Sequence, residues 1–189
     1  MLRKETEKYL NDFAKYVIQQ SRSNLTKSKK KYENKLYNSL DKEIEVGANS
    51  FRLAFLMEDY GKFVDKGVKG ANPNNVSPNA KIRGQQAPDS PYRFGSGNFK
   101  GTWKDFTQGL EKWVKSKNLR LRDSKGRYSK GNVKSIAQIV ASNIYARGIK
   151  PSLFFTKPFE KAFERLPDEL IEAYGLDVEQ FLEYTINKK

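Results

Sequence analysis

The sequence predicts an α+β protein in which an N-terminal helix and an antiparallel β-hairpin or small sheet are flanked by several C-terminal helices. Apolar residues recur at helical spacing near the N-terminus and in the C-terminal half. Between these regions, two short runs alternate apolar and polar residues, as half-buried strands do. A length of 189 residues is most simply one domain spanning 1–189.

Helical periodicity places the first helix at about residues 2–20. Its apolar face consists of Leu10, Phe13, Ala14, Val17 and Ile18. A short helical segment follows near 32–40. Residues 44–48 and 51–57 then alternate in polarity around the turn residues 47–50, and they predict the two arms of an antiparallel hairpin.

A long loop or arm is expected from 70 to 102, because this stretch has no clear period and is rich in Gly and Pro. Structureless loops of this length are uncommon and are usually functional or disordered. Its aromatic residues indicate that it packs against another part of the protein. They are Tyr92, Phe94 and Phe99, and Trp103 follows directly after the loop.

The C-terminal half predicts further helices at 103–114, 132–147, 156–165 and 176–186. Asn132 is the expected N-cap of the helix at 132–147, and Gly148 is its expected C′ residue. Residues 118–131, between the first two of these helices, predict a basic loop or a short hairpin.

The chain contains neither cysteine nor histidine. Thiolate and imidazole nucleophiles are therefore excluded, as are zinc sites built from these residues. We expect no enzymatic activity, no catalytic residue, no cofactor and no metal. No apolar run approaches the roughly 18 residues that span a bilayer, and the N-terminal MLRKETEKYL precedes no apolar region typical of a secretory signal. We therefore expect no membrane partner and synthesis in a cytoplasm.

Charge is unevenly distributed along the chain. The net charge is +14, yet residues 151–187 contain eight acids and three bases, so the rest of the chain carries +19. A basic body with an acidic C-terminal segment favours either contact with a polyanion or head-to-tail contact between copies. Charge alone does not choose between them.

Two clusters of basic residues are candidates for an interface or for polyanion contact. One consists of Arg120, Arg122, Lys125, Arg127 and Lys130 with Tyr128, and the other of Lys29, Lys30 and Lys31, together with Lys27 and Tyr32. Lys and Arg side chains neutralise phosphates, and a neighbouring aromatic ring stacks on bases. The alternative for each is a solvated loop or a protein-contact arm. Neither contains a recognised DNA-reading motif.

Three sequence elements occur in an order that resembles a family of phage proteins. The first is a Leu-x-x-Ser-Leu element at 36–40. The second is Tyr60-x-x-Phe63-Val64-Asp65-x-Gly67, with Asp65 where the family usually has Glu. The third consists of Gly148, Pro151, Phe154 and Phe155 at the end of one helix and before the next. Together they resemble the tail-completion and head–tail joining proteins of the HK97 gp10 and lambda minor tail protein Z type.

The resemblance implies a non-enzymatic structural protein of the virion of a tailed phage, assembled in the host cytoplasm. It would form part of the neck or tail-completion ring at the head–tail junction, with copies of itself and neighbouring connector or tail proteins as partners. The stretch from 70 to 131 is longer than the family requires, and the resemblance implies nothing about it.

Two other functions remain open on the sequence. The basic clusters favour a nucleic-acid-binding accessory protein with non-specific DNA contact. Glu58, Asp59 and Asp65 suggest a carboxylate metal site of nuclease type, but adjacent strand residues point to opposite faces, which disfavours this arrangement.

Overall fold

The computed structural model divides the chain into two compact units. Unit 1 comprises Met1–Asp65 and Ser152–Lys189, and unit 2 comprises Lys66–Pro151. The structure describes residues 4–28, 34–46, 50–74, 83–97, 102–122, 125–129, 132–166 and 168–172. Where the sequence suggested one domain, unit 2 is thus an insertion within unit 1, and the chain passes between the units twice.

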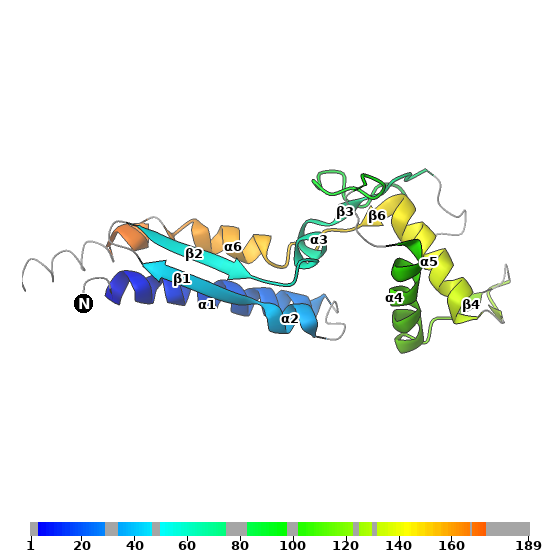
Figure 1. The fold of residues 1–189 in the computed structure, drawn as a ribbon, viewed down its shortest axis with the longest axis horizontal. Coiled ribbons are helices and arrows are strands. Elements are labelled where there is room, and N and C mark those ends of the chain that lie inside the picture. The colour runs from blue at the N-terminus through cyan, green and yellow to red at the C-terminus, as the bar shows by residue number, and fades with distance from the viewer. Residues whose placement is uncertain are drawn as a thin grey trace, which may run out of the picture. The chain divides into compact units, whose positions relative to one another are not determined.

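The described part of unit 1 contains the 24-residue helix α1, shorter helices and one β-hairpin (Figure 1). Its elements are α1 (Lys4–Lys27), α2 (Lys35–Ser39), β1 (Asp41–Val46), β2 (Phe51–Leu56), α3 (Gly61–Lys66, ending at the boundary) and α6 (Thr156–Phe163). The mixed helix and sheet content confirms the predicted α+β class. The first helix extends beyond its expected end to Lys27. The predicted helix at 176–186, and the turn residues 47–49, lie outside the described residues.

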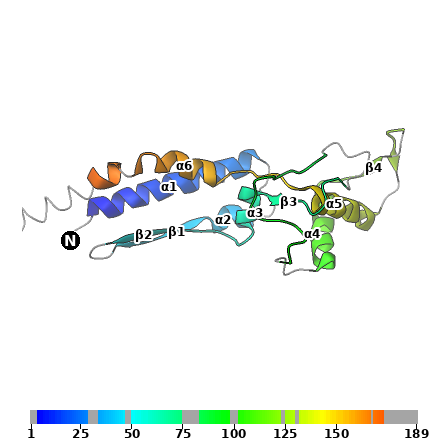
Figure 2. The ribbon, with the colours of Figure 1, turned by 90° about the horizontal axis from the view of Figure 1, so that it is seen from above.

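The hairpin presents its apolar face to α1 and α6, which lie side by side along it (Figures 1 and 2). The antiparallel register pairs Ile44 with Leu53 and Lys42 with Phe55, so these side chains share one face. Phe55 meets Phe155 and Phe159 edge to face, with ring centroids 5.1 and 5.9 Å apart. Aromatic pairs at such distances stabilise a core beyond the area that they bury.

The opposite face of the hairpin is polar, because side chains alternate along a strand. It carries Glu43 and Glu45 on β1 and Arg52 on β2, all exposed. Glu45 and Arg52 are cross-strand partners whose charged atoms lie 3.7 Å apart in solvent. Exposed pairs of this kind contribute little to stability.

A buried cluster joins α1, α2 and the segment before α6. It contains Ile18, Leu25, Leu36, Leu40 and Phe154. The side chain of Phe154 is only 1% exposed. This cluster holds distant parts of the sequence together in the core of unit 1.

Unit 2 consists of two packed helices, a short hairpin and a second small sheet. Its elements are β3 (Val68–Lys69), α4 (Trp103–Ser116), β4 (Leu121–Arg122), β5 (Tyr128–Ser129), α5 (Val133–Arg147) and β6 (Gly148–Ile149). The helices meet through Val114, Ile136 and Ala137. The Asn132 side chain accepts a hydrogen bond from the Ser135 amide at 2.7 Å, which confirms the predicted N-cap.

The β3–β6 pair was not predicted from the sequence. Val68 pairs with Ile149 and Lys69 with Gly148 in antiparallel register. Two residues on each strand are too few to create a visible alternation of polarity. The pairing therefore depends on tertiary context rather than on local pattern.

The described parts of the expected loop, 70–74 and 83–97, contain no helix, and an isolated bridge between Lys69 and Arg93 is their only strand-like contact. The Lys69 amide donates to the Tyr92 carbonyl at 2.7 Å, and the Phe94 amide donates to the Lys69 carbonyl at 2.9 Å. The Phe94 ring lies 5.5 Å from that of Tyr145. These contacts order residues 83–97 against β3 and α5. Phe99 lies outside the described residues.

Candidate interaction surfaces

Asp65, at the end of α3, holds the start of α6 in unit 1. Its Oδ1 accepts hydrogen bonds from the amides of Phe155 at 2.9 Å and Thr156 at 3.2 Å, and its Oδ2 accepts one from the Thr156 hydroxyl. The first amides of a helix lack partners within the helix, and a carboxylate there also interacts favourably with the helix dipole. Asp65 therefore caps a helix from a distance of 90 residues along the chain.

The backbone around Asp65 reinforces this contact. The amides of Ser152 and Leu153 donate to the Asp65 carbonyl at 3.1 and 3.0 Å, and the Ser152 hydroxyl donates to the Val64 carbonyl at 2.6 Å. Leu153 has a φ of 51°, a left-handed conformation that a branched side chain rarely adopts. We call this set of contacts the Asp65 clamp. It fixes the two points where the chain leaves and re-enters unit 1 next to each other.

Two glycines of the phage-like elements lie where strands β3 and β6 approach each other. A Cβ on Gly67 would lie 2.4 Å from the Ile149 carbonyl oxygen, and one on Gly148 would lie 2.1 Å from that of Val68. Both residues also have positive φ, 72° and 94°. Only glycine satisfies both conditions, so these positions are required by the β3–β6 pair.

The residues that carry the resemblance thus occupy two places. In unit 1, Val64 and Phe155 pack against the cluster that contains Leu36, Leu40 and Phe154. In unit 2, Gly67, Gly148 and Pro151 lie together at the β3–β6 pair. Tyr60 and Phe63 are exposed, at 40% and 36% of their surface. Most residues that carry the resemblance therefore have a structural role: they fix the backbone conformation or pack in the core.

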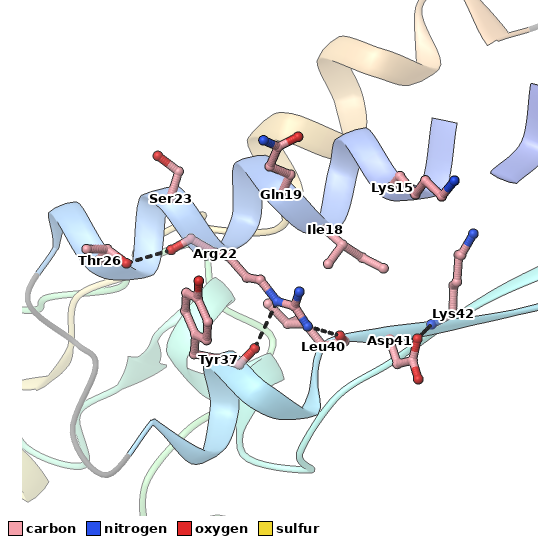
Figure 3. A pocket seen from close by; sticks show the side chains of 10 residues that line it. All are labelled: Lys15, Ile18, Gln19, Arg22, Ser23, Thr26, Tyr37, Leu40, Asp41 and Lys42. Atoms are coloured by element: carbon pink, nitrogen blue, oxygen red, sulfur yellow. Dashed lines mark hydrogen bonds between the residues drawn. The ribbon is translucent and has the colours of Figure 1, made fainter. Parts of the chain in front are cut away.

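A groove of about 510 Å³ lies in unit 1 between α1 and the α2–β1 junction (Figure 3). It is lined by Lys15, Ile18, Gln19, Arg22, Ser23, Thr26, Tyr37, Leu40, Asp41 and Lys42. Figure 3 shows Arg22 reaching from α1 towards the α2–β1 junction. It donates to the carbonyls of Tyr37 at 3.1 Å and Leu40 at 2.9 Å. A cation at these carbonyls stabilises the end of α2, so the role of Arg22 is structural.

Three basic side chains and one acidic side chain line the groove: Lys15, Arg22, Lys42 and Asp41. Burial, and then the Lys15 ammonium, lower the pKa of Lys42 from its usual value. The Lys42 Nζ donates to the Asn11 carbonyl at 3.4 Å, which partly satisfies it. Asp12 and Asp41 act on the pKa of Lys42 in the opposite direction, and the Lys15 ammonium lies 3.9 Å from the Asp12 carboxylate.

The basic hairpin of unit 2, described at 120–122 and 125–129, brings together four of the predicted basic residues and Tyr128. The Arg122 guanidinium lies 4.5 Å from the centroid of the Tyr128 ring, and that of Arg120 lies 5.7 Å from it. Arg122 also donates to the Gly126 carbonyl at 2.9 Å and to the Tyr128 hydroxyl at 3.0 Å. Lys125 and Arg127 are exposed on the same hairpin.

Several predicted residues are not part of this arrangement. Lys130 and the cluster of Lys29, Lys30 and Lys31 lie outside the described residues. Glu58 and Asp59 are exposed, whereas Asp65 is buried in its clamp. Among the residues that the structure describes, no three acidic side chains gather in a way that would hold a metal ion. Nor does any helix there combine the length and apolar character that crossing a membrane requires.

The sequence did not reveal the roles of Asp65 and Arg22. Asp65 precedes the helix that it caps by a whole inserted unit, so no local capping pattern exists. Arg22 lies on the polar side of a helix, where its neighbours in sequence suggest only solvent contact.

Comparison with protein-family models, with curated proteins and with solved structures finds no match to this chain. The resemblance to head–tail joining proteins therefore depends on the three sequence elements described above.

Proposed function

We propose that this protein is a non-enzymatic structural component of the virion of a tailed phage. It would form part of the neck or tail-completion ring at the head–tail junction. Its partners would be copies of itself in a cyclic ring and the neighbouring connector or tail proteins. Assembly would take place in the host cytoplasm.

The observation that carries the proposal is the incomplete sheet of unit 1. In the described part of the chain, β1 and β2 pair only with each other, so each strand has an outer edge without a strand beside it. Such edges accept strands from other chains. A heterologous contact repeated by rotation closes into a ring.

Exposed apolar residues also lie at the two ends of β2, one on each face of the hairpin. Phe51 is 46% exposed and Leu56 is 40% exposed. Aromatic and aliphatic side chains of this kind are typical of the buried centre of an interface. A strand of a second copy that paired with β2 would place its own side chains beside Phe51 on one face and beside Leu56 on the other.

Charge supports contact between copies as well. The described part of the acidic C-terminal segment has exposed carboxylates at Glu160, Glu164 and Asp168, while the rest of the chain is strongly basic. Complementary charges accelerate association and fix its orientation.

The test is the assembly state of the full chain, alone and mixed with connector or tail proteins. Light scattering gives the mass, and electron microscopy shows whether rings form and where the protein lies in particles. We expect rings, and we expect the double variant Phe51→Glu/Leu56→Glu to remain a folded monomer.

The matched control for the single variant Phe51→Glu is Ile139→Glu, which introduces the same charge at an equally exposed position, 46%, on α5 of unit 2. It should assemble as the wild type does. A wild-type protein that stays monomeric at all concentrations and never joins particles would contradict the proposal.

A further inference from the structure

We propose that the basic hairpin of unit 2 binds the phosphodiester backbone of a nucleic acid without reading its base sequence. The proposal is independent of the assembly function, since it depends only on residues of the hairpin and of the helices α4 and α5 that support it. It concerns the stretch about which the phage resemblance implies nothing.

The hairpin concentrates positive charge on a small exposed element. Arg120, Arg122, Lys125 and Arg127 all lie on its surface within eight positions of the sequence. Among the described residues, neither Arg120 nor Arg122 forms an ion pair; their contacts are with Tyr128 and the Gly126 carbonyl. Their charge is therefore not neutralised by a described carboxylate.

Tyr128 holds the two guanidinium groups in place. The Arg122 guanidinium lies over the Tyr128 ring. Two of its N–H groups donate hydrogen bonds, one to the Gly126 carbonyl and one to the Tyr128 hydroxyl. A guanidinium has five N–H donors, so others remain for a phosphate oxygen. A side chain that is already ordered loses less entropy when it binds.

Leu121 fixes the base of the hairpin to unit 2. It lies between the two arginines and packs against the cluster of Val114, Ile136 and Ala137. Because successive side chains of a strand point to opposite faces, burial of Leu121 directs Arg120 and Arg122 away from the core. The packed helices α4 and α5 thus hold the hairpin and its charged side chains in place.

The composition of the hairpin favours phosphate over a protein partner. Residues 120–129 contain four bases and a single acid, Asp123, and basic charge of this density attracts phosphate groups. Strands of two residues each are too short to form a ribbon that fills the major groove, so base reading is not expected.

The test is a salt series of binding by fluorescence anisotropy with the full chain. The probes are two unrelated DNA duplexes of equal length and one single strand. Four phosphate contacts from the hairpin would contribute a slope of about −3.6 to log K against log salt, or about 150-fold weaker duplex binding between 50 and 200 mM salt. In Arg120→Gln/Arg122→Gln this contribution should fall to about −1.8, or about 12-fold.

The control is Lys104→Gln/Lys112→Gln, which removes the same charge from exposed positions on α4. It should keep the full slope, because only hairpin charges touch the phosphates. Equal slopes for the two double variants would overturn the proposal, as would a difference of more than about tenfold between the two duplexes.

The single-stranded probe shows whether the hairpin binds the phosphates of a duplex, of a single strand or of both. Each contact then contributes a slope of about −0.7 instead of −0.9, and binding of either form supports the shared phosphate chemistry. Poly-glutamate at equal charge concentration should displace the DNA only weakly. Displacement as effective as that by unlabelled DNA would overturn phosphate recognition in favour of an acidic polypeptide.

Discussion

Asp65 links two parts of the chain that the sequence keeps far apart. Its carboxylate accepts hydrogen bonds from two amides and a hydroxyl at the start of α6, and its carbonyl accepts two more from Ser152 and Leu153. The side chain is 5% exposed. A buried charge is tolerated when its hydrogen bonds are all made, and it is costly to leave its partners without one.

Replacing Asp65 should therefore destabilise unit 1. We expect Asp65→Ala to lower the free energy of unfolding by about 3 kcal/mol, since it leaves the amides of Phe155 and Thr156 without an acceptor. Asp65→Asn keeps one acceptor oxygen and should cost less, about 1–2 kcal/mol. Denaturant unfolding followed by far-UV circular dichroism measures both.

The exposed neighbour Asp59 provides the control, because Asp59→Ala should change stability by no more than about 0.5 kcal/mol. Both tryptophans, Trp103 and Trp113, belong to unit 2, so tryptophan fluorescence follows that unit separately. Equal losses for Asp59→Ala and Asp65→Ala would show that the clamp has no special role.

Among the elements, α4 begins with the most complete local cap. The Thr102 side chain accepts from the Asp105 amide, and the Asp105 carboxylate accepts from the Thr102 amide and hydroxyl. This reciprocal arrangement provides acceptors for the backbone amides of Thr102 and Asp105, which have no partner within the helix. The hydrogen bond from the Thr102 side chain, and then that from its amide, lower the pKa of Asp105.

The lowered pKa gives this helix a defined response to acid. A carboxyl whose pKa is lower in the folded state stabilises the protein above its unfolded pKa, here 3.8, and loses that contribution as the pH falls through the folded value. The stability difference between wild type and Asp105→Ala should be largest near neutral pH and shrink below about pH 4. Unfolding experiments at a series of pH values, followed by tryptophan fluorescence, test this.

Thr102→Ala separates the cap from other acid effects. It should itself cost about 1 kcal/mol, and in its background the pH-dependent part of the Asp105→Ala difference should become smaller. A pH dependence that is unchanged in that background would show that Thr102 does not lower this pKa.

Local pattern predicted the elements well where each is long enough to show its period. The apolar face of α1, the helix α5 with its N-cap Asn132 and the two arms of the β1–β2 hairpin follow from local pattern alone. The pair β3–β6 did not, because two residues per strand show no alternation. The Asp65 clamp did not either, since its partners meet only after the inserted unit has folded back. Of the candidate site, the basic residues of the hairpin were predicted, but the stacking of two arginines on Tyr128 was not.

For the molecule as a whole, the decisive feature is that unit 2 is inserted into unit 1. The two crossing points are adjacent, since the Ser152 amide lies 3.1 Å from the Asp65 carbonyl oxygen. The buried clusters of the two units share no residue. Each unit thus has its own core, as an independently folding domain requires.

Unit 1 should therefore fold without unit 2. Replacing residues 66–151 with a Gly-Ser-Gly linker should leave a protein that retains helical circular dichroism and melts cooperatively. The reason is that the clamp already holds the joined ends within a distance that three residues span.

The same excision combined with Asp65→Ala should melt at a lower temperature, because the clamp then no longer fixes the new junction. A product that shows no cooperative transition would demonstrate instead that unit 1 depends on unit 2 for its fold.

The inserted arrangement also affects how the protein responds to a protease. One cut in the backbone within 66–151 produces two fragments, each of which supplies part of unit 1. The first contributes α1 and the hairpin, and the second contributes α6 and Phe154 in the same buried cluster. The severed pieces would stay bound through that shared core, so a single nick leaves the molecule whole.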